Sequence, residues 1–164
     1  MVEKIVAFFS FLNKEALVFV ISMLPIVELR GAIPVAASLD VNIFSAYFIS
    51  VIGNLLPVPF ILFLIRPIFN YLKKTKLFKP LVDKIEARTL SKADKVMKNA
   101  ALGLFLFVAI PLPGTGAWTG ALLAALLDMR AKYAFPSIVA GVIVAGLIMT
   151  LASYGVASFL NFLV

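Results

Sequence analysis

Hydrophobic residues run along this chain in long uncharged stretches, and two of these extend from Val41 to Ile65 and from Asn99 to Leu127. The first would measure about 38 Å as an α-helix, more than the bilayer's hydrocarbon core of about 30 Å. Because the apolar runs are continuous rather than alternating, they favour helices over strands. Hydrophobic residues make up 63% of the chain, and the mean hydropathy is +1.09. We therefore expect an all-α integral membrane protein that crosses the membrane more than once.

The two halves of the chain resemble each other. The segment "ALVFVISMLP", which begins at Ala16, matches "ALGLFLFVAIP", which begins at Ala101. The segments "GAIPVAASLD" and "GAWTGALLAALLD" match as well, and they end at Asp40 and Asp128. Beyond these aspartates the two halves stay in register without a gap. The pattern indicates an internal repeat, a feature that decides the fold of a chain when it is present.

Each repeat is expected to contain an amphipathic helix, a helical hairpin with a Pro- and Gly-rich tip, and a transmembrane helix. The stripe of the first amphipathic helix is Val2, Ile5, Val6, Phe9 and Leu12. The expected single membrane domain over residues 1–164 divides into a first repeat at 1–65, a basic loop at 66–98 and a second repeat at 99–164.

The arms of the hairpins are too short to cross a bilayer. In the first half they would measure about 18 and 14 Å as helices. Each hairpin could form one broken crossing, or it could dip into the membrane and return as a re-entrant hairpin. The re-entrant arrangement puts Arg130 and Lys132 on the cytoplasmic side, as the positive-inside rule favours. The two halves would then have opposite orientations, so we expect an inverted repeat, as in many transporters.

The net charge of +7 is concentrated in the loop at 66–98. The positive-inside rule predicts that this loop is cytoplasmic, and hence a multi-pass protein of the inner or plasma membrane. We expect no nucleic-acid partner, because a basic balance in so apolar a chain mainly reflects topology. The loop also contains a stripe typical of an amphipathic helix, interrupted at Thr89, which either docks on anionic headgroups or is a solvated connector. The stripe consists of Phe78, Leu81, Val82, Ile85, Ala93, Val96 and Met97.

Two segments break the apolar pattern and are candidate hairpin tips. The first tip is "PIVELRGAIP" (residues 25–34) and the second tip is "PLPGTGAWTG" (residues 111–120). Proline and glycine end a helix and reverse the chain, and the outgoing helices are expected to begin near Gly31 and Gly116. A helix N-terminus at such a turn favours anions, and Arg30 adds a charge suited to a phosphate or carboxylate. Glu28 is its partner or a titrating group, since ionisable residues within membrane segments are functional candidates.

The candidate substrate-binding residues come from both tips and from a break in the first long helix. At that break, where Gly53, Pro57 and Pro59 surround Asn54, a kink with a satisfied amide and a ligand contact are both possible. The set consists of Glu28, Arg30, Gly31, Asn54, Gly114, Thr115, Gly116 and Trp118. The chain has no Cys and no His, which excludes thiolate and imidazole metal sites and Ser-His-Asp chemistry. No nucleophile–base pair stands out, so we expect no enzyme activity, no metal and no cofactor.

The segments "ELRGAIP" and "PLPGTGAWTG" also carry a family resemblance. In a chain of this length they resemble the bacterial and archaeal putative small multidrug export proteins, a family similar to the DedA and VTT-domain membrane proteins. The resemblance covers nearly the whole chain and implies two re-entrant hairpins in inverted repeat. DedA-like proteins are implicated in recycling lipid carriers such as undecaprenyl phosphate, often with dependence on the proton-motive force. DedA-type sequences tend to carry charges around both hairpins, whereas the second tip here carries none.

The leading hypothesis is a flippase for an amphipathic anion, such as a polyprenyl phosphate or a phospholipid, held between the two tips by Arg30 and by backbone amides. An alternative is an exporter of small lipophilic cations in which Glu28 binds the substrate and exchanges a proton. A third is a membrane scaffold whose basic loop recruits a partner. We expect membrane lipids as partners, and a homo-oligomer, because two hairpins and two crossing helices enclose little volume.

Overall fold

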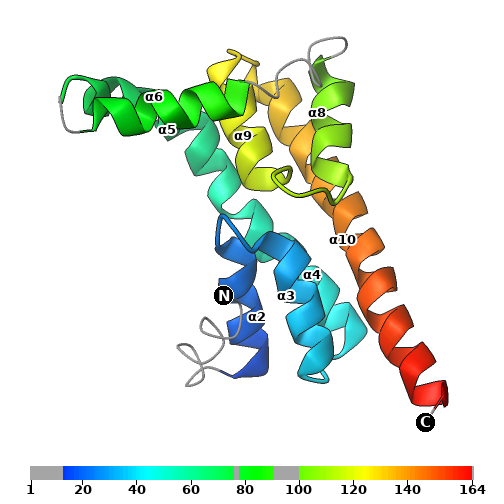
Figure 1. The fold of residues 1–164 in the computed structure, drawn as a ribbon. Coiled ribbons are helices and arrows are strands. Elements are labelled where there is room, and N and C mark those ends of the chain that lie inside the picture. Colours follow the sequence, from blue (N-terminus) through cyan, green and yellow to red (C-terminus); the bar gives the residue numbers. More distant parts are fainter. Residues whose placement is uncertain (1–12, 76–77, 91–99, 164) are drawn as a thin grey trace. The chain divides into compact units, whose positions relative to one another are not determined.

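The computed structural model describes residues 13–75, 78–90 and 100–163, with side chains up to residue 155. Every regular element in these residues is an α-helix, as the sequence predicts (Figure 1). The stripe expected at residues 2–12 and the end of the loop stripe at residues 93–97 lie outside the described residues. The chain divides into two compact units, unit 1 (Met1–Leu56 and Val142–Val164) and unit 2 (Pro57–Gly141).

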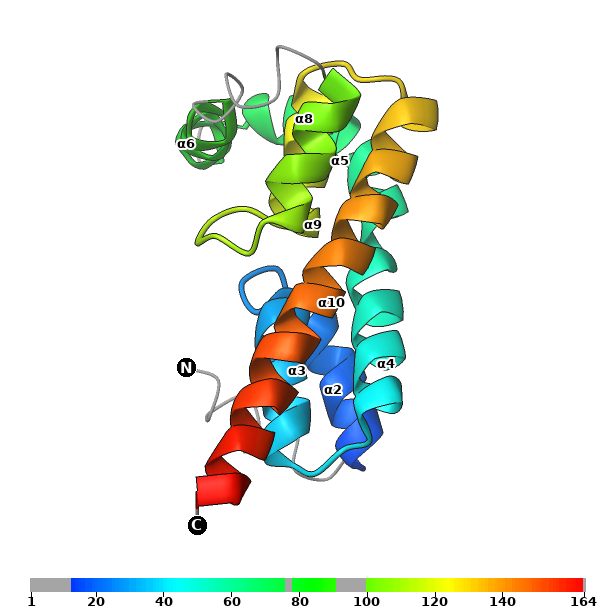
Figure 2. The same cartoon turned by 90° about the vertical axis from the view of Figure 1, so that its right-hand side faces the viewer.

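Unit 1 is built around a helical hairpin. Its first helix begins after Asn13, whose side chain accepts a hydrogen bond from the Ala16 amide. Lys14, at the start of that helix, donates to the Leu39 carbonyl at the end of the second helix (2.6 Å), so the two helices are antiparallel. A third helix packs against both, as two views show (Figures 1 and 2). The three helices are α2 (Lys14–Met23), α3 (Glu28–Ser38) and α4 (Ile43–Leu55).

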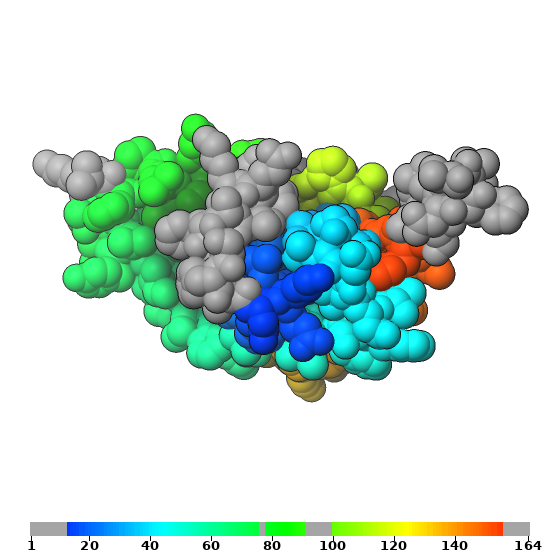
Figure 3. Space-filling model, turned by 90° about the horizontal axis from the view of Figure 1, so that it is seen from below, coloured from blue at the N-terminus to red at the C-terminus, as the bar shows by residue number. Residues whose placement is uncertain are grey.

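The apolar core of unit 1 lies where the hairpin meets α4. Seen from below, the ends of the hairpin and the start of α4 lie against each other (Figure 3, blue and cyan). The core brings together small and branched side chains from all three helices. It contains Leu17, Val18, Ile21, Val27, Ala32, Ala36, Val41 and Ala46.

The end of the long helix α10 (Ala131–Leu163) completes unit 1. The Tyr154 hydroxyl donates to the Val41 carbonyl (2.7 Å), and the Tyr47 hydroxyl donates to the Ile143 carbonyl (3.2 Å). Gly146 lets the two helices approach, because a Cβ there would come within 2.9 Å of the Tyr47 ring. Small residues at helix interfaces are typical of membrane proteins.

Unit 2 contains the second hairpin and the helices that follow α4. In the second hairpin, Gly120 near the start of the outgoing helix lies against Val108 near the end of the incoming one. The elements of unit 2 are α5 (Pro57–Lys73), α6 (Lys79–Leu90), α8 (Ala100–Ala109), α9 (Ala117–Leu126) and the first part of α10. The outgoing helix α9 also packs on α5 and α6, the two helices that precede the hairpin in the chain (Figure 1).

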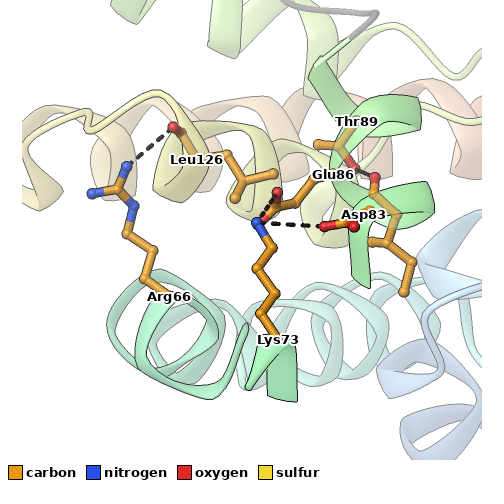
Figure 4. Close-up of polar contacts among 7 residues, drawn as sticks. Arg66, Lys73, Asp83, Glu86, Thr89 and Leu126 are labelled. Atoms are coloured by element: carbon orange, nitrogen blue, oxygen red, sulfur yellow. Dashed lines mark hydrogen bonds and ion pairs between the residues drawn. The ribbon is translucent and has the colours of Figure 1, made fainter. Parts of the chain in front are cut away.

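Charged side chains join α5 to its neighbours in unit 2 (Figure 4). Lys73 contacts Glu86 (2.5 Å) and Asp83 (3.8 Å) on α6. Arg66 pairs with Asp128 and donates to the Leu126 carbonyl at the end of α9 (3.2 Å). A pocket of about 350 Å³ lies among these helices, lined by Arg66, Phe69, Asn70, Glu86, Leu90 and Leu126.

The helix predicted in the basic loop is present as α6, but its buried face differs from the predicted stripe. Val82 and Thr89 are buried, whereas Phe78 and Leu81 are exposed. Thr89 was expected to interrupt the stripe. It lies on the buried face because its hydroxyl donates to the Ile85 carbonyl one turn earlier (2.8 Å), which satisfies the polar group.

Two helical segments are long and apolar enough to cross a membrane, Ile43–Lys73 and Ala131–Gly155. The first contains the expected break, because α4 ends at Leu55 and α5 begins at Pro57. The second lies in the second repeat, after the second hairpin, where a transmembrane helix is expected from the sequence. The re-entrant placement of the hairpins and the inverted orientation of the repeats stay predictions.

Matching positions of the repeat have matching structures within their own units. A Cβ on Gly53 would lie 2.9 Å from the Phe19 carbonyl oxygen of the first hairpin. A Cβ on Gly141 would lie 2.9 Å from the Phe105 carbonyl oxygen of the second. In each half, therefore, the helix after the hairpin approaches the incoming arm at a glycine.

Asp40 and Asp128, at the ends of the matching segments, also have matching backbones. Both have left-handed backbones, with φ of 55° and 56°. The amide after each reaches back to the outgoing helix, from Val41 to Ala36 and from Met129 to Ala124 (both 3.0 Å). These bonds form the turn that ends a helix, so the aspartates terminate α3 and α9. Asn42 caps α4.

Candidate functional site

The first tip is a short turn between α2 and α3. The Glu28 amide donates to the Leu24 carbonyl (2.9 Å), and α3 begins at Glu28. The expected start near Gly31 is therefore wrong by about one turn. Gly31 lies inside α3, where its amide donates to the Val27 carbonyl (3.0 Å), and an added Cβ would overlap the Val27 side chain. Gly31 thus provides space for packing, while the chain reversal takes place before it.

Glu28 combines burial with an unfavourable backbone. It is 4% exposed, and its φ of 52° is in the left-handed region, which side chains other than glycine rarely adopt. Strained residues of this kind cost about 1 to 3 kcal/mol and cluster at functional sites. A buried carboxylate adds a desolvation cost. The fold therefore holds an ionisable group in a position that is unfavourable in two ways.

Arg30 is the charged neighbour of Glu28. Both residues belong to the first turn of α3, and the two side chains interact electrostatically. Arg30 is only partly buried, whereas Glu28 is buried. The carboxylate therefore lies inside the hairpin and the guanidinium nearer the surface, and whether Glu28 acts as the partner of Arg30 or as a titrating group stays a prediction.

Asn54 lies in unit 1 on α4. It is 1% exposed, and its Oδ1 has no hydrogen-bond partner among the described residues. The helix is interrupted at Leu56, two residues after Asn54, and the amide oxygen is not satisfied within the described residues. Sequence reasoning missed two similar oxygens in unit 1, Ser50 Oγ and Thr150 Oγ1, which are also buried and unpartnered in the described part of the chain. The spacing of Ser50 four residues before Asn54 was the available signal.

The second tip is built from glycines. Gly114 and Gly116 have φ of 77° and 126°, and Gly116 precedes α9, which begins at Ala117 as predicted. The Thr115 hydroxyl donates to the carbonyls of Leu112 (2.8 Å) and Ile110 (3.0 Å). That hydroxyl therefore stabilises the turn.

A small, mainly apolar pocket of about 160 Å³ lies beside the second tip in unit 2. Its wall includes Thr115, together with the apolar end of α8. Trp118, in the first turn of α9, is partly buried. The full lining is Gly103, Leu106, Phe107, Ile110, Leu112 and Thr115.

The predicted site residues fall into two groups, one in each unit. The group in unit 1 lies on α3 and α4 and includes both charged residues. The group in unit 2 consists of the glycine-rich second tip and the tryptophan that follows it. Within the described residues no group of three acidic side chains is placed to hold a metal ion. Unit 1 contains Glu28, Arg30, Gly31 and Asn54; unit 2 contains Gly114, Thr115, Gly116 and Trp118.

An all-helical chain with two apolar helices of crossing length and charged groups within one of its apolar hairpins is typical of membrane transport proteins. A family model described as "Putative small multi-drug export protein" matches residues 28–148, well over half of the chain. The chain belongs to this family, whose description is that of a membrane exporter. No curated protein and no solved structure matches the chain. The similarity to DedA and VTT-domain proteins stays a prediction.

Proposed function

We propose that this protein exports small lipophilic cations and that Glu28 binds the substrate in exchange for a proton. The proposal is supported by the family description and by one structural observation, the buried carboxylate of Glu28 on a left-handed backbone. Drug-like cations combine an apolar body with a positive charge. A carboxylate within an apolar hairpin offers both a counter-charge and an apolar surrounding.

The strain at Glu28 supports a role beyond packing. A glycine would adopt this backbone without penalty, as Gly114 does in the second tip. Desolvation of the carboxylate adds a second cost at the same residue; on insertion scales an acidic residue at a membrane helix centre costs about 2.5 to 3.5 kcal/mol. Two penalties at one residue are the expected signature of a group that is required for its chemistry.

Exchange of the cationic substrate for a proton depends on whether the Glu28 carboxylate is ionised. Ionised Glu28 can hold an organic cation, and protonated Glu28 cannot. Arg30 is a resident positive charge beside it, so an incoming cation competes with Arg30 for the carboxylate. Substrate release on one side of the membrane would accompany proton uptake by Glu28.

The test uses purified protein in proteoliposomes with an imposed pH gradient and tetraphenylphosphonium as the probe. We expect Glu28→Gln to reduce proton-driven movement of the probe at least tenfold, because the amide cannot ionise. Glu15→Gln is the matched control, since Glu15 is an exposed glutamate in the first turn of α2. Wild-type rates in Glu28→Gln at equal protein content would refute the proposal.

A second candidate is the flippase for an amphipathic anion predicted from the sequence. The observation that favours it is the partial exposure of Arg30, which leaves a guanidinium within reach of a phosphate. In leaflet-resolved transport of a polyprenyl phosphate or phospholipid, Arg30→Ala should then lose activity while Glu28→Gln retains it. Cation export is supported instead if neither variant affects lipid movement and Glu28→Gln loses tetraphenylphosphonium movement while Arg30→Ala keeps it. In both cases we propose that the loop at 66–98 is cytoplasmic.

A further inference from the structure

Two oxygen atoms on one face of α4 are buried without a donor. Ser50 is 0% exposed and Asn54 is 1% exposed. Neither Ser50 Oγ nor Asn54 Oδ1 has a hydrogen-bond partner in the described residues. The residues are four apart on a helix, so their side chains lie one above the other on the same face. Buried polar atoms are usually paired, and each exception requires an explanation.

The backbone at the end of α4 adds further oxygens to the same region. Pro57 and Pro59 have no amide hydrogen, so the helical bonds that would reach the carbonyls of Gly53 and Leu55 cannot form. Leu56 keeps a helical backbone between the end of α4 and the start of α5 at Pro57, so these two carbonyls lie within a nearly continuous helix but lack their usual amide donors.

The chemistry of these groups selects the ligand. They are neutral oxygen acceptors, and α4 contains no acidic residue. Hard oxygen ligands without a carboxylate suit a monovalent cation better than a divalent one, because divalent ions are normally held by carboxylates. An anion is disfavoured, because Asn54 Oδ1 and the two backbone carbonyls offer lone pairs and no donor hydrogen.

We propose that the Ser50–Asn54 face of α4, with the carbonyls at the helix break, binds a monovalent cation of the size of Na⁺. The cation would be coordinated by the two unpartnered oxygens of Ser50 and Asn54. The inference goes beyond the exporter proposed above, because ion binding here requires neither Glu28 nor a transported substrate.

The test is the melting temperature of the purified full-length protein in detergent, in NaCl, LiCl, KCl or choline chloride at equal ionic strength. A ligand that binds only the folded state raises the melting temperature in a saturable way. We expect Na⁺ to raise it by several degrees over choline, and Asn54→Leu to abolish that rise. Ser50→Ala, the milder variant, should shift the half-maximal concentration at least fivefold upward.

Ser22→Ala is the matched control. Ser22 is also a fully buried serine of unit 1, but its hydroxyl already donates to the Phe19 carbonyl (2.7 Å). This variant should keep the wild-type response to Na⁺. Equal melting temperatures in all four salts, which would also be the result if water fills the site, overturn the inference, as does a full Na⁺ response in Asn54→Leu. Transport is not part of this readout, so failure of the exporter is seen separately.

Discussion

The two hairpins are alike at their open ends and differ at their tips. In each, the outgoing helix ends at an aspartate with a left-handed backbone, and a basic side chain donates to a carbonyl at that end. Lys14 donates to Leu39 in the first hairpin, and Arg66 donates to Leu126 in the second. The two open ends thus have the same arrangement of groups, although the basic side chain is a lysine in one and an arginine in the other.

Both tips contain a residue with a left-handed backbone, but the residue type differs. Glu28 follows Pro25 by three residues, and Gly114 follows Pro111 by three residues. Both have positive φ, but only Gly114 does so without steric cost. The difference shows that the left-handed turn does not require a glutamate. A carboxylate at that position of the first hairpin is therefore better explained by its chemistry than by its conformation.

The largest expected change in stability concerns the glycines at which the helix after each hairpin approaches the incoming arm. It tests whether the two halves share this close contact. Gly53→Ala and Gly141→Ala should each destabilise the protein by about 1 to 3 kcal/mol, because each new methyl group presses on a backbone carbonyl that cannot rotate away. Denaturant titration in detergent, followed by circular dichroism, measures both. Gly155→Ala is the control, since no atom of the described residues lies within 4 Å of its Cβ position. If only one of the two substitutions lowered the free energy of unfolding, the two halves would not share this packing.

The next effect sharpens the contrast between the tips. Glu28→Gly should raise the free energy of unfolding by about 1 kcal/mol, because it removes the backbone strain, while it abolishes proton-driven cation transport. Gly114→Ala should lower that free energy by about the same amount, since alanine resists a φ of 77°. Chemical unfolding and the proteoliposome assay on the same preparations give both values. A less stable Glu28→Gly protein would mean that the glutamate side chain supports the fold.

The smallest effect concerns the open end of the second hairpin. Asp128→Asn should change the free energy of unfolding by less than about 1 kcal/mol, because the Arg66–Asp128 pair is exposed and asparagine tolerates the left-handed backbone. Melting curves of the two proteins measure the difference. A loss of several kcal/mol would show that the ionic contact, rather than the helix termination, is the main determinant of this end.

Much of the helical framework could be predicted from the positions of charge, proline and glycine. The two long helices, the break at Pro57 and the start of α9 after Gly116 are where the pattern indicates. The start of α3 differs from the expected one because the pattern of glycines points to Gly31 as the turn residue, whereas Glu28 adopts the turn conformation. A sequence pattern identifies glycines, but it does not show which residue carries a positive φ.

The candidate site was predictable in its charges and not in its orphan oxygens. Glu28 and Arg30 are conspicuous because ionisable groups are rare in apolar segments. Ser50 is one of many serines in the chain, and a serine on a helix commonly bonds to a preceding carbonyl, as Ser22 does. Only the packing of unit 1 shows that Ser50 is buried without such a bond.

The basic side chains at the open ends of the hairpins have a practical consequence for biochemical work. The Asp128 side chain is 76% exposed, so dissolved ions can reach the contact that helps to hold the end of α9. Glu28 at the first tip is buried and is shielded from them. Ionic strength therefore acts selectively on the exposed end of the second hairpin, and salt concentration becomes a way to weaken that contact without affecting the buried carboxylate of Glu28 in the first.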